Sequence, residues 1–160
     1  MSPEEGARAP AERLATLGLT LPKVTPPLAA YVPAVRTGDY VYTAGQLPVV
    51  DGKLLATGKL GADVTTAEAA ALARTCALNA LAAVTTVTGG LDAIVRIVKV
   101  TGFVSSAPHF TEQAQVINGA SELLIEVFGE AGRHARSAVG MAVLPLDAPV
   151  EVELIAEVRD

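Results

Sequence analysis

The amino-acid sequence predicts an α+β domain in which one mainly antiparallel β-sheet is covered on one face by two helices. Two segments repeat apolar residues at helical spacing, and several shorter segments are rich in β-branched residues and bounded by glycine or proline. In chain order these segments read β-β-α-β-α-β-β. The other face of such a sheet needs a cover, and symmetric association of several copies would supply it.

Length and composition indicate one compact domain. We assign residues 1–160 to it, with residues 1–20 as an N-terminal helical extension. Hydrophobic residues make up 51% of the chain but aromatic residues only 4%, so small aliphatic side chains must form most of the core. A surface this poor in charge often continues into a subunit interface, and we therefore expect an oligomer.

Charge and hydropathy limit the partners that the chain can have. Its net charge of −5 argues against nucleic acid as the main partner. The longest charge-free runs, such as residues 75–91, contain Asn79, several threonines and two glycines, and they are shorter than the roughly 20 apolar residues that span a bilayer. We expect no membrane-spanning segment.

The ionisable and sulfur-containing residues favour a cytoplasmic protein without a metal. Cys76 is the only cysteine, which excludes an internal disulfide and a multi-cysteine metal site. Two histidines leave few further ligands for zinc or copper. Glu4, Glu5 and Glu12 lie where a signal peptide would be basic and apolar, so secretion is not indicated.

The first part of the chain contains a short helix, an extended segment and a predicted hairpin. Residues 3–18 read as a helix that ends at Gly18, and residues 21–33 contain too much proline for an interior strand. Residues 40–44 are rich in strand formers. Asp51-Gly52 is a turn that we expect to join this strand to the next one.

Two longer helices are predicted to cover the sheet. Thr65 and Glu68 form a capping-box pattern that begins the first helix, and the pair Gly89-Gly90 is expected to end it. Residues 110–128 read as the second helix, with Gly129 as its C-terminal cap.

Three strands are predicted after the first of these helices. Residues 94–104 are rich in β-branched side chains and precede the second helix. Residues 135–144 and 150–158 follow it, and the loop of residues 145–149 separates them. This completes the predicted order of elements.

Arg136 is the first candidate for a functional residue. It lies in the stretch His134 to Gly140 (HARSAVG), where a guanidinium that is always charged stands among small residues and is costly to bury alone. Glu151 and Glu153 share one face of the last strand because their spacing is two. If the last two strands pair, Arg136 either forms a structural ion pair with a glutamate or binds a substrate carboxylate while a glutamate handles water or a proton.

Common motifs for other chemistry are missing from the sequence. It contains no G-x-G-x-x-G, Walker A, H-E-x-x-H or G-x-S-x-G pattern, so readings as a nucleotide-binding protein, zinc protease or α/β-hydrolase lose their usual support.

Several short motifs in a fixed order resemble the RidA/YjgF family of enamine/imine deaminases, from about residue 26 to the C-terminus. The family's fold is a chorismate-mutase-like (bacillus type) sheet with two helices, assembled as a homotrimer with clefts between subunits. The motifs are Tyr31, Thr43 to Pro48 (TAGQLP), Val116 to Asn118 (VIN), Ala135 to Val139 (ARSAV), Leu144-Pro145 and Val150 to Glu153 (VEVE).

The resemblance implies an activity and a set of site residues. The activity is hydrolysis of 2-imino or 2-enamino acids, such as 2-aminoacrylate and 2-iminobutyrate, to 2-keto acids and ammonia without metal or organic cofactor. Arg136 matches the residue that holds the substrate carboxylate, and Glu151 matches the residue proposed to position the attacking water. The matching substrate-binding positions are Tyr31, Ala44, Gly45, Asn118, Ser137 and Ala138.

The chain also departs from the short form of this family. Ala138 stands where cysteine is common, and Ala44 stands where a hydroxyl residue is common. The N-terminal helix, the segment Gly58 to Gly61 and the longer run before His134 indicate an extended subgroup with a reshaped cleft. We interpret Lys59 as a solvated loop charge. His134 shares a face with Arg136 and could carry a proton near neutral pH, but a lone histidine at the start of a strand is usually a surface residue.

Two other functions stay open at this point. The same cleft could serve a non-catalytic protein that binds a carboxylate metabolite and regulates a partner. Some members of the family carry the label of an endoribonuclease, although a pI near 5.0 and the lack of a basic, aromatic stripe disfavour that activity.

Overall fold

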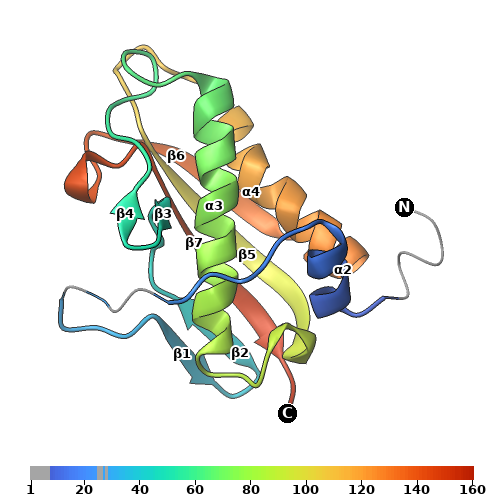
Figure 1. The fold of residues 1–160 in the computed structure, drawn as a ribbon. Helices are drawn as coiled ribbons and strands as arrows, with labels where there is room; N and C mark the ends of the chain where they lie inside the picture. Colours follow the sequence, from blue (N-terminus) through green and yellow to red (C-terminus); the bar gives the residue numbers. More distant parts are fainter. Residues whose placement is uncertain (1–7, 25–26, 28) are drawn as a thin grey trace.

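The computed structural model describes residues 8–24, 27 and 29–160 as a mixed five-stranded sheet with helices on one face (Figure 1). The strands are β1 (Ala34–Thr37), β2 (Tyr40–Thr43), β5 (Ile94–Ser105), β6 (Ala135–Met141) and β7 (Val150–Val158). Their order across the sheet is β1-β2-β7-β5-β6, so β1 and β6 are the two edges. All neighbours are antiparallel except β5 and β6.

The helices α3 (Thr66–Thr85) and α4 (Gln113–Phe128) pack side by side on this sheet (Figure 1). The predicted capping box is present, because the Thr65 side chain accepts from the Glu68 backbone and the Glu68 side chain accepts from Thr65. The two helices approach closely at Gly119, where an added Cβ would overlap the Ala70 carbonyl oxygen. Helix α3 ends four residues before the predicted Gly89-Gly90 stop.

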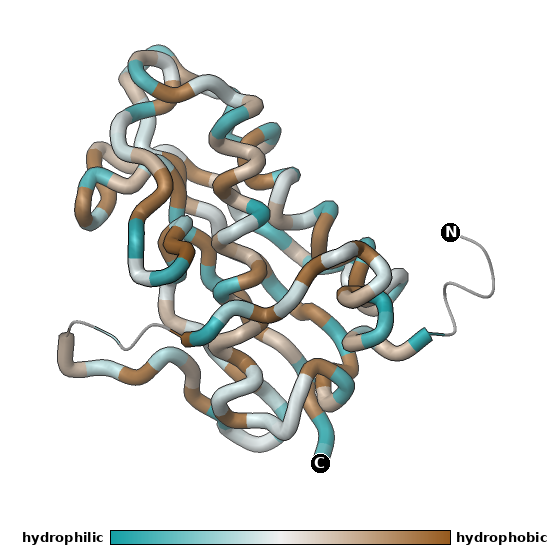
Figure 2. Tube along the Cα trace, in the orientation of Figure 1, coloured by the Kyte–Doolittle hydropathy of each residue, from teal (hydrophilic) through white to brown (hydrophobic). Residues whose placement is uncertain are grey.

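The core lies between the helices and the sheet, and Figure 2 shows hydrophobic residues recurring along both layers. Strand β7 alternates strictly, since Val150, Val152 and Leu154 are buried while Glu151 and Glu153 are only half-buried. Alternate residues of a strand point to opposite faces. The glutamates therefore lie on the face that the helices leave uncovered.

The short helix α2 (Pro10–Thr16) lies against the C-terminal end of α4 (Figure 1). The Ala11 N–H donates to the Asp92 carboxylate at 3.0 Å, and Gly18 follows the helix with a φ of 74°. This confirms part of the helix predicted over residues 3–18, while residues 3–7 lie outside the described residues.

The sequence prediction paired the wrong strands in the first hairpin. Asp51-Gly52 does form a turn, but it joins β3 (Val49–Val50) to β4 (Lys53–Leu54), a hairpin separate from the main sheet. The partner of β2 is β1, which the sequence prediction missed. Strand β1 has only four residues and follows directly on the proline-rich segment, so it offers too little pattern to be recognised.

Helix α3 would by length and composition alone be able to cross a membrane. In this fold 56% of the most apolar stretch of α3 is buried, and α3 packs on β7. It therefore has the character of a core helix.

Candidate functional site

Arg136 lies on the edge strand β6 and reaches across to α4. Its Nη1 donates to Asn118 Oδ1 at 2.8 Å and to Ser121 Oγ at 3.2 Å, and its Nη2 donates to the Ala114 carbonyl at 3.3 Å. All three acceptors are neutral. None of the four ion pairs found among the described residues includes Arg136. The guanidinium is thus held firmly while its charge stays unneutralised.

The hydrogen bonds to α4 leave one edge of this guanidinium open. An arginine carries five N–H donors. Nη1 donates to two acceptors of α4 and Nη2 donates to one, while Nε has no acceptor in the described part of the chain. Nε and Nη2 form one edge of the guanidinium, and such an edge can bind a carboxylate through two parallel hydrogen bonds.

The ion pair between Arg136 and a glutamate of the last strand, one of the two alternatives that the sequence left open, is not formed. Strand β5 lies between β6 and β7, because β5, α4 and β6 form a parallel crossover that places β6 directly beside β5. Arg136 faces α4, whereas Glu151 lies on the opposite, uncovered face. Strand pairing of β6 with β7 was therefore the wrong assumption.

Glu151 sits beside a β-bulge. Tyr42 pairs with Ile155 and Gln46 pairs with Val152, so the stretch that follows β2 has one residue more than the facing part of β7. The bulge brings Gly45 against Glu151, and an added Cβ at Gly45 would lie 2.8 Å from the Glu151 carboxyl carbon. Only glycine allows this approach.

Ala44 lies in the bulge next to Gly45, and Tyr31 lies in the loop that precedes β1. The Ala44 N–H donates to the Pro33 carbonyl at 2.8 Å, which places the loop that carries Tyr31 beside the bulge. The Tyr31 side chain is 54% exposed and thus accessible to a ligand or to another subunit. We call Tyr31, Ala44, Gly45 and Glu151 the Glu151 group.

Asn118 and Ala138 accompany Arg136, but Ser137 does not. Asn118 bonds Arg136 directly, and Ala138 lies two residues along β6 on the same face. Ser137 shares a row of the sheet with Thr101 and Glu153, which puts it on the uncovered face. The residues predicted from the ARSAV motif therefore lie on both faces of the sheet.

One chain does not bring Arg136 and Glu151 together. The two residues lie two strands apart, on opposite faces, and in different rows, since Val100 pairs with Arg136 while Phe103 pairs with Glu151. Neighbouring strands are about 4.8 Å apart. A site that uses both side chains on one small ligand needs a second copy of the chain.

The environment of Glu151 changes its acidity. Burial raises the pKa of the Glu151 carboxyl first, and the neighbouring charge of Glu153 raises it further. A carboxyl whose pKa moves toward neutrality is better suited to accept and return a proton.

Two polar residues beside Arg136 were missed or undervalued in the sequence. His134 Nε2 lies 2.8 Å from Ser121 Oγ, and His134 Nδ1 lies 2.6 Å from the Gly132 carbonyl. A cavity of about 210 Å³ is lined by Ser121, Ile125, Arg133, His134 and Arg136. The spacing of Ser121 three residues after Asn118, on one helix face, is the pattern that would have indicated it.

Lys59 is also more constrained than a solvated loop charge. Its ammonium donates to Ser105 Oγ at 3.1 Å and to the Ala142 carbonyl, and its backbone N–H donates to Asp63 Oδ2 at 3.0 Å. The prediction of a free surface lysine was wrong because the sequence does not reveal that the loop of residues 142–149 folds over it.

The remaining candidates are structural. Cys76 is fully buried in the core, and burial raises the pKa of its thiol well above the ordinary value. Among residues 8–24, 27 and 29–160, no three side chains of His, Cys, Asp or Glu gather in one place.

The fold and the arrangement of these residues define an α+β protein of the chorismate-mutase-like class. The family model described as "YjgF/chorismate mutase-like, putative endoribonuclease" matches residues 11–158. The chain belongs to this YjgF family, and the family predicted from its motifs is confirmed.

Relatives and solved structures agree with this membership. The chain is 46% identical to protein TCP17 of Trypanosoma cruzi over 94% of both chains. A putative endoribonuclease of Shewanella oneidensis has a crystal structure similar to this fold, with a TM-score of 0.91, 40% identity, and coverage of 94% of this chain and 100% of that one. The structure of E. coli TdcF with bound serine is similar with a TM-score of 0.63 and 28% identity, covering 86% of this chain and 94% of that one.

Proposed function

We propose that the protein hydrolyses 2-imino and 2-enamino acids, such as 2-aminoacrylate and 2-iminobutyrate, to 2-keto acids and ammonia without a cofactor. The observation that carries this proposal is the open edge of Arg136, a charged group with neutral partners only. A substrate carboxylate supplies the missing anion and fits its fork. The TdcF structure supports a ligand of this kind, because serine has the same carboxylate beside a nitrogen-bearing carbon.

Arg136 and Glu151 have different roles in this mechanism. Arg136 holds the carboxylate, which fixes the position of C2. An enamine first gains a proton at C3 to become the protonated imine. Water then attacks C2 of the protonated imine while Glu151 takes a proton from the water, and Glu151 passes this proton to the nitrogen. Glu151 then takes the remaining hydroxyl proton as the C–N bond breaks, which gives the keto acid and ammonia.

The proposed site lies between copies in a homotrimer. Support comes from the separation of Arg136 and the Glu151 group within one chain. An edge strand of one copy that meets the uncovered face of the next copy is a head-to-tail contact, and repetition of such a contact closes a ring of three when each copy is rotated by a third of a turn from the last. Exposed apolar side chains on the uncovered face provide surface for it: Val35, Tyr40, Tyr42, Val139 and Met141.

We further propose that the protein is cytoplasmic and that its partners are this small carboxylate and its own copies. Its buried free thiol suits a reducing compartment.

Activity on an unstable imine tests the proposal. 2-Iminobutyrate is generated in situ from its amino acid by an oxidase, and release of the keto acid is compared with spontaneous hydrolysis. We expect acceleration by the wild type and a loss of about 100-fold or more in Arg136→Ala. Arg74→Ala removes a surface arginine that pairs with Glu126 and serves as the control. A wild type that gives no acceleration contradicts the proposal for these substrates.

A second candidate function is non-catalytic binding of a carboxylate metabolite. The same open edge of Arg136 favours it, because carboxylate capture alone needs no residue of the Glu151 group. Thermal stabilisation by a keto acid that disappears in Arg136→Lys, together with no turnover, would support this alternative.

An endoribonuclease is the weakest alternative. It rests on the words "putative endoribonuclease" that describe the family and the Shewanella oneidensis structure. RNA cleavage that co-purifies with the protein and survives Arg136→Ala would favour it.

A further inference from the structure

We propose that His134, acting through Ser121, is a positioning residue for Arg136 and couples carboxylate binding at Arg136 to proton uptake by His134. This inference rests on the proposed function, because it takes a carboxylate as the ligand of Arg136. It adds two residues, one on α4 and one directly before β6, whose roles the family motifs do not supply.

The hydrogen bonds around His134 fix the tautomer of its neutral ring and its orientation. The Gly132 carbonyl can only accept, so Nδ1, at 2.6 Å from it, carries a proton and donates. In the neutral ring Nε2 is then an acceptor, and it takes the hydroxyl proton of Ser121 at 2.8 Å. The Ser121 oxygen is thereby left to accept from Arg136 Nη1 at 3.2 Å. One chain of hydrogen bonds therefore runs from Arg136 through Ser121 and His134 to Gly132.

These hydrogen bonds orient the open edge of the guanidinium. Asn118 and Ser121 occupy both hydrogens of Nη1, so rotation about the end of the arginine side chain would break both bonds. A hydroxyl oxygen has two lone pairs, so a protonated His134 can donate to Ser121 Oγ while that oxygen still accepts from Arg136 Nη1. His134 therefore holds Arg136 in the orientation that a carboxylate needs in either protonation state.

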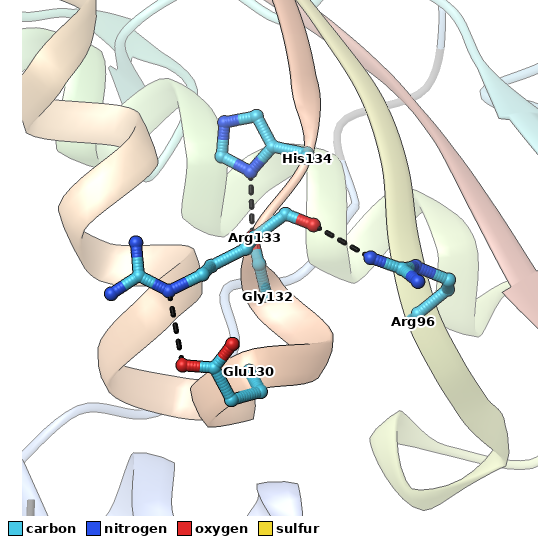
Figure 3. A network of polar contacts seen from close by, with 5 residues as sticks. All are labelled: Arg96, Glu130, Gly132, Arg133 and His134. Carbon is cyan, nitrogen blue, oxygen red and sulfur yellow. Dashed lines mark hydrogen bonds and ion pairs between the residues drawn. The ribbon is translucent and has the colours of Figure 1, made fainter.

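The charged side chains that line the cavity beside His134 are Arg133 and Arg136. Figure 3 shows His134 with Arg133 and the residues that they contact, Gly132, Glu130 and Arg96. Arg133 is tied by its Nε to Glu130 Oε1 at 3.1 Å, and its carbonyl accepts from Arg96 Nη2 at 2.9 Å. The carboxylate of Glu130 is thus engaged away from the imidazole.

These surroundings determine the sign of the coupling. Burial lowers the pKa of His134, the bond to the Gly132 carbonyl raises it, and the charge of Arg136 lowers it again. A carboxylate bound at Arg136 offsets that positive charge and so raises the pKa of His134. By linkage, the affinity for the carboxylate must rise as the pH falls through the range in which His134 titrates.

A titration of both histidines by NMR tests the coupling in the full-length protein. His109 is the second histidine of the chain and lies exposed before α4, which makes it an internal reference. We expect the His134 pKa to rise when saturating 2-oxobutyrate is added, and to rise in ligand-free Arg136→Ala. Arg136→Lys keeps the charge and should leave the pKa of His134 closer to that of the wild type.

Binding of 2-oxobutyrate between pH 5.5 and pH 8 gives a second readout, by calorimetry. We expect the wild-type affinity to rise by about 3- to 10-fold as the pH falls, up to the tenfold per pH unit that uptake of one proton permits. His134→Gln keeps an acceptor for Ser121 but does not titrate, so it should bind at neutral pH with the slope abolished. Ser121→Ala should lose affinity at every pH, and the control His109→Gln should behave like the wild type.

The outcomes separate this inference from the proposed function. A wild-type protein that binds no keto acid at any pH contradicts the proposed function. An unchanged His134 pKa in Arg136→Ala overturns the coupling, whatever the protein binds. A pH slope that persists in His134→Gln overturns it as well, because another group then takes up the proton.

Discussion

The charge of Arg136 is held by neutral groups, so the side chain is fixed in place while its charge stays available to an anion. Three acceptors on α4 restrain it without neutralising it. A carboxylate partner from the protein would have been a stronger restraint, but it would have occupied the fork. The bonds to α4 therefore leave the guanidinium able to bind an anion from outside.

Gly45 should be the most sensitive glycine near the site. Gly45→Ala puts a methyl group into the space of the Glu151 carboxylate and must displace it. We expect a fall of about 10-fold or more in kcat/KM for imine hydrolysis, because the displaced carboxylate no longer meets the water. Gly89→Ala is the matched control, since nothing lies within 4 Å of its added Cβ. Full activity in Gly45→Ala would remove Glu151 from the mechanism as proposed.

Glu151 should also destabilise the fold at neutral pH. Its folded-state pKa is raised above that of the unfolded chain, so the ionised form costs stability. That cost is absent below the unfolded pKa and fully present above the folded one. We expect Glu151→Gln to raise Tm by about 1–3 °C at pH 8 and to have little effect near pH 4. Glu157→Gln, on the same face of β7, is the control, and equal shifts in both variants at pH 8 would contradict the assignment to Glu151.

At the scale of elements, Lys59 joins three segments that are far apart in the sequence. Its ammonium reaches β5 through Ser105 and the loop after β6 through Ala142, while its backbone is held by Asp63. The neighbouring Gly58 N–H donates to the Asp147 carbonyl at 3.0 Å. The segment thus ties down the loop that leads into Glu151.

Lys59→Met should loosen this loop. It removes the donors of two hydrogen bonds and leaves the buried Ser105 hydroxyl without its partner. We expect a loss of about 1–3 kcal/mol in the free energy of unfolding, measured by urea denaturation. Lys53→Met, on the exposed strand β4, is the control. Equal stability of the two lysine variants would show that Lys59 is a surface charge after all.

Elements with strong local patterns could be predicted from the sequence. The capping box of Thr65 and Glu68 begins α3, Gly129 ends α4, and β5 and β7 lie within one residue of their predicted bounds. The neighbours of each strand could not be predicted in the same way, because pairing depends on contacts between distant segments. The contact of His134 with Ser121 was hidden for the same reason.

At the scale of the whole molecule, the two groups of site residues lie at different surfaces of the chain. Arg136 belongs to the edge strand β6, and Glu151 belongs to the uncovered face of β7. A head-to-tail ring would bring the first surface of one copy onto the second surface of the next. If the site forms between copies, a mixture of two inactive variants can regain activity. A site formed within one chain could not regain activity in this way.

Co-expressed Arg136→Ala and Glu151→Gln chains should complement each other. Each variant alone spoils every site, but in a mixed trimer an intact Arg136 can face an intact Glu151 across an interface. Random assembly at equal amounts makes about one quarter of the sites intact, so we expect about one quarter of the wild-type activity. The double variant co-expressed with Arg136→Ala contains no intact Arg136 and should stay inactive. If both residues act within one chain, the mixture also stays inactive, and light scattering of the same samples shows whether a trimer is present at all.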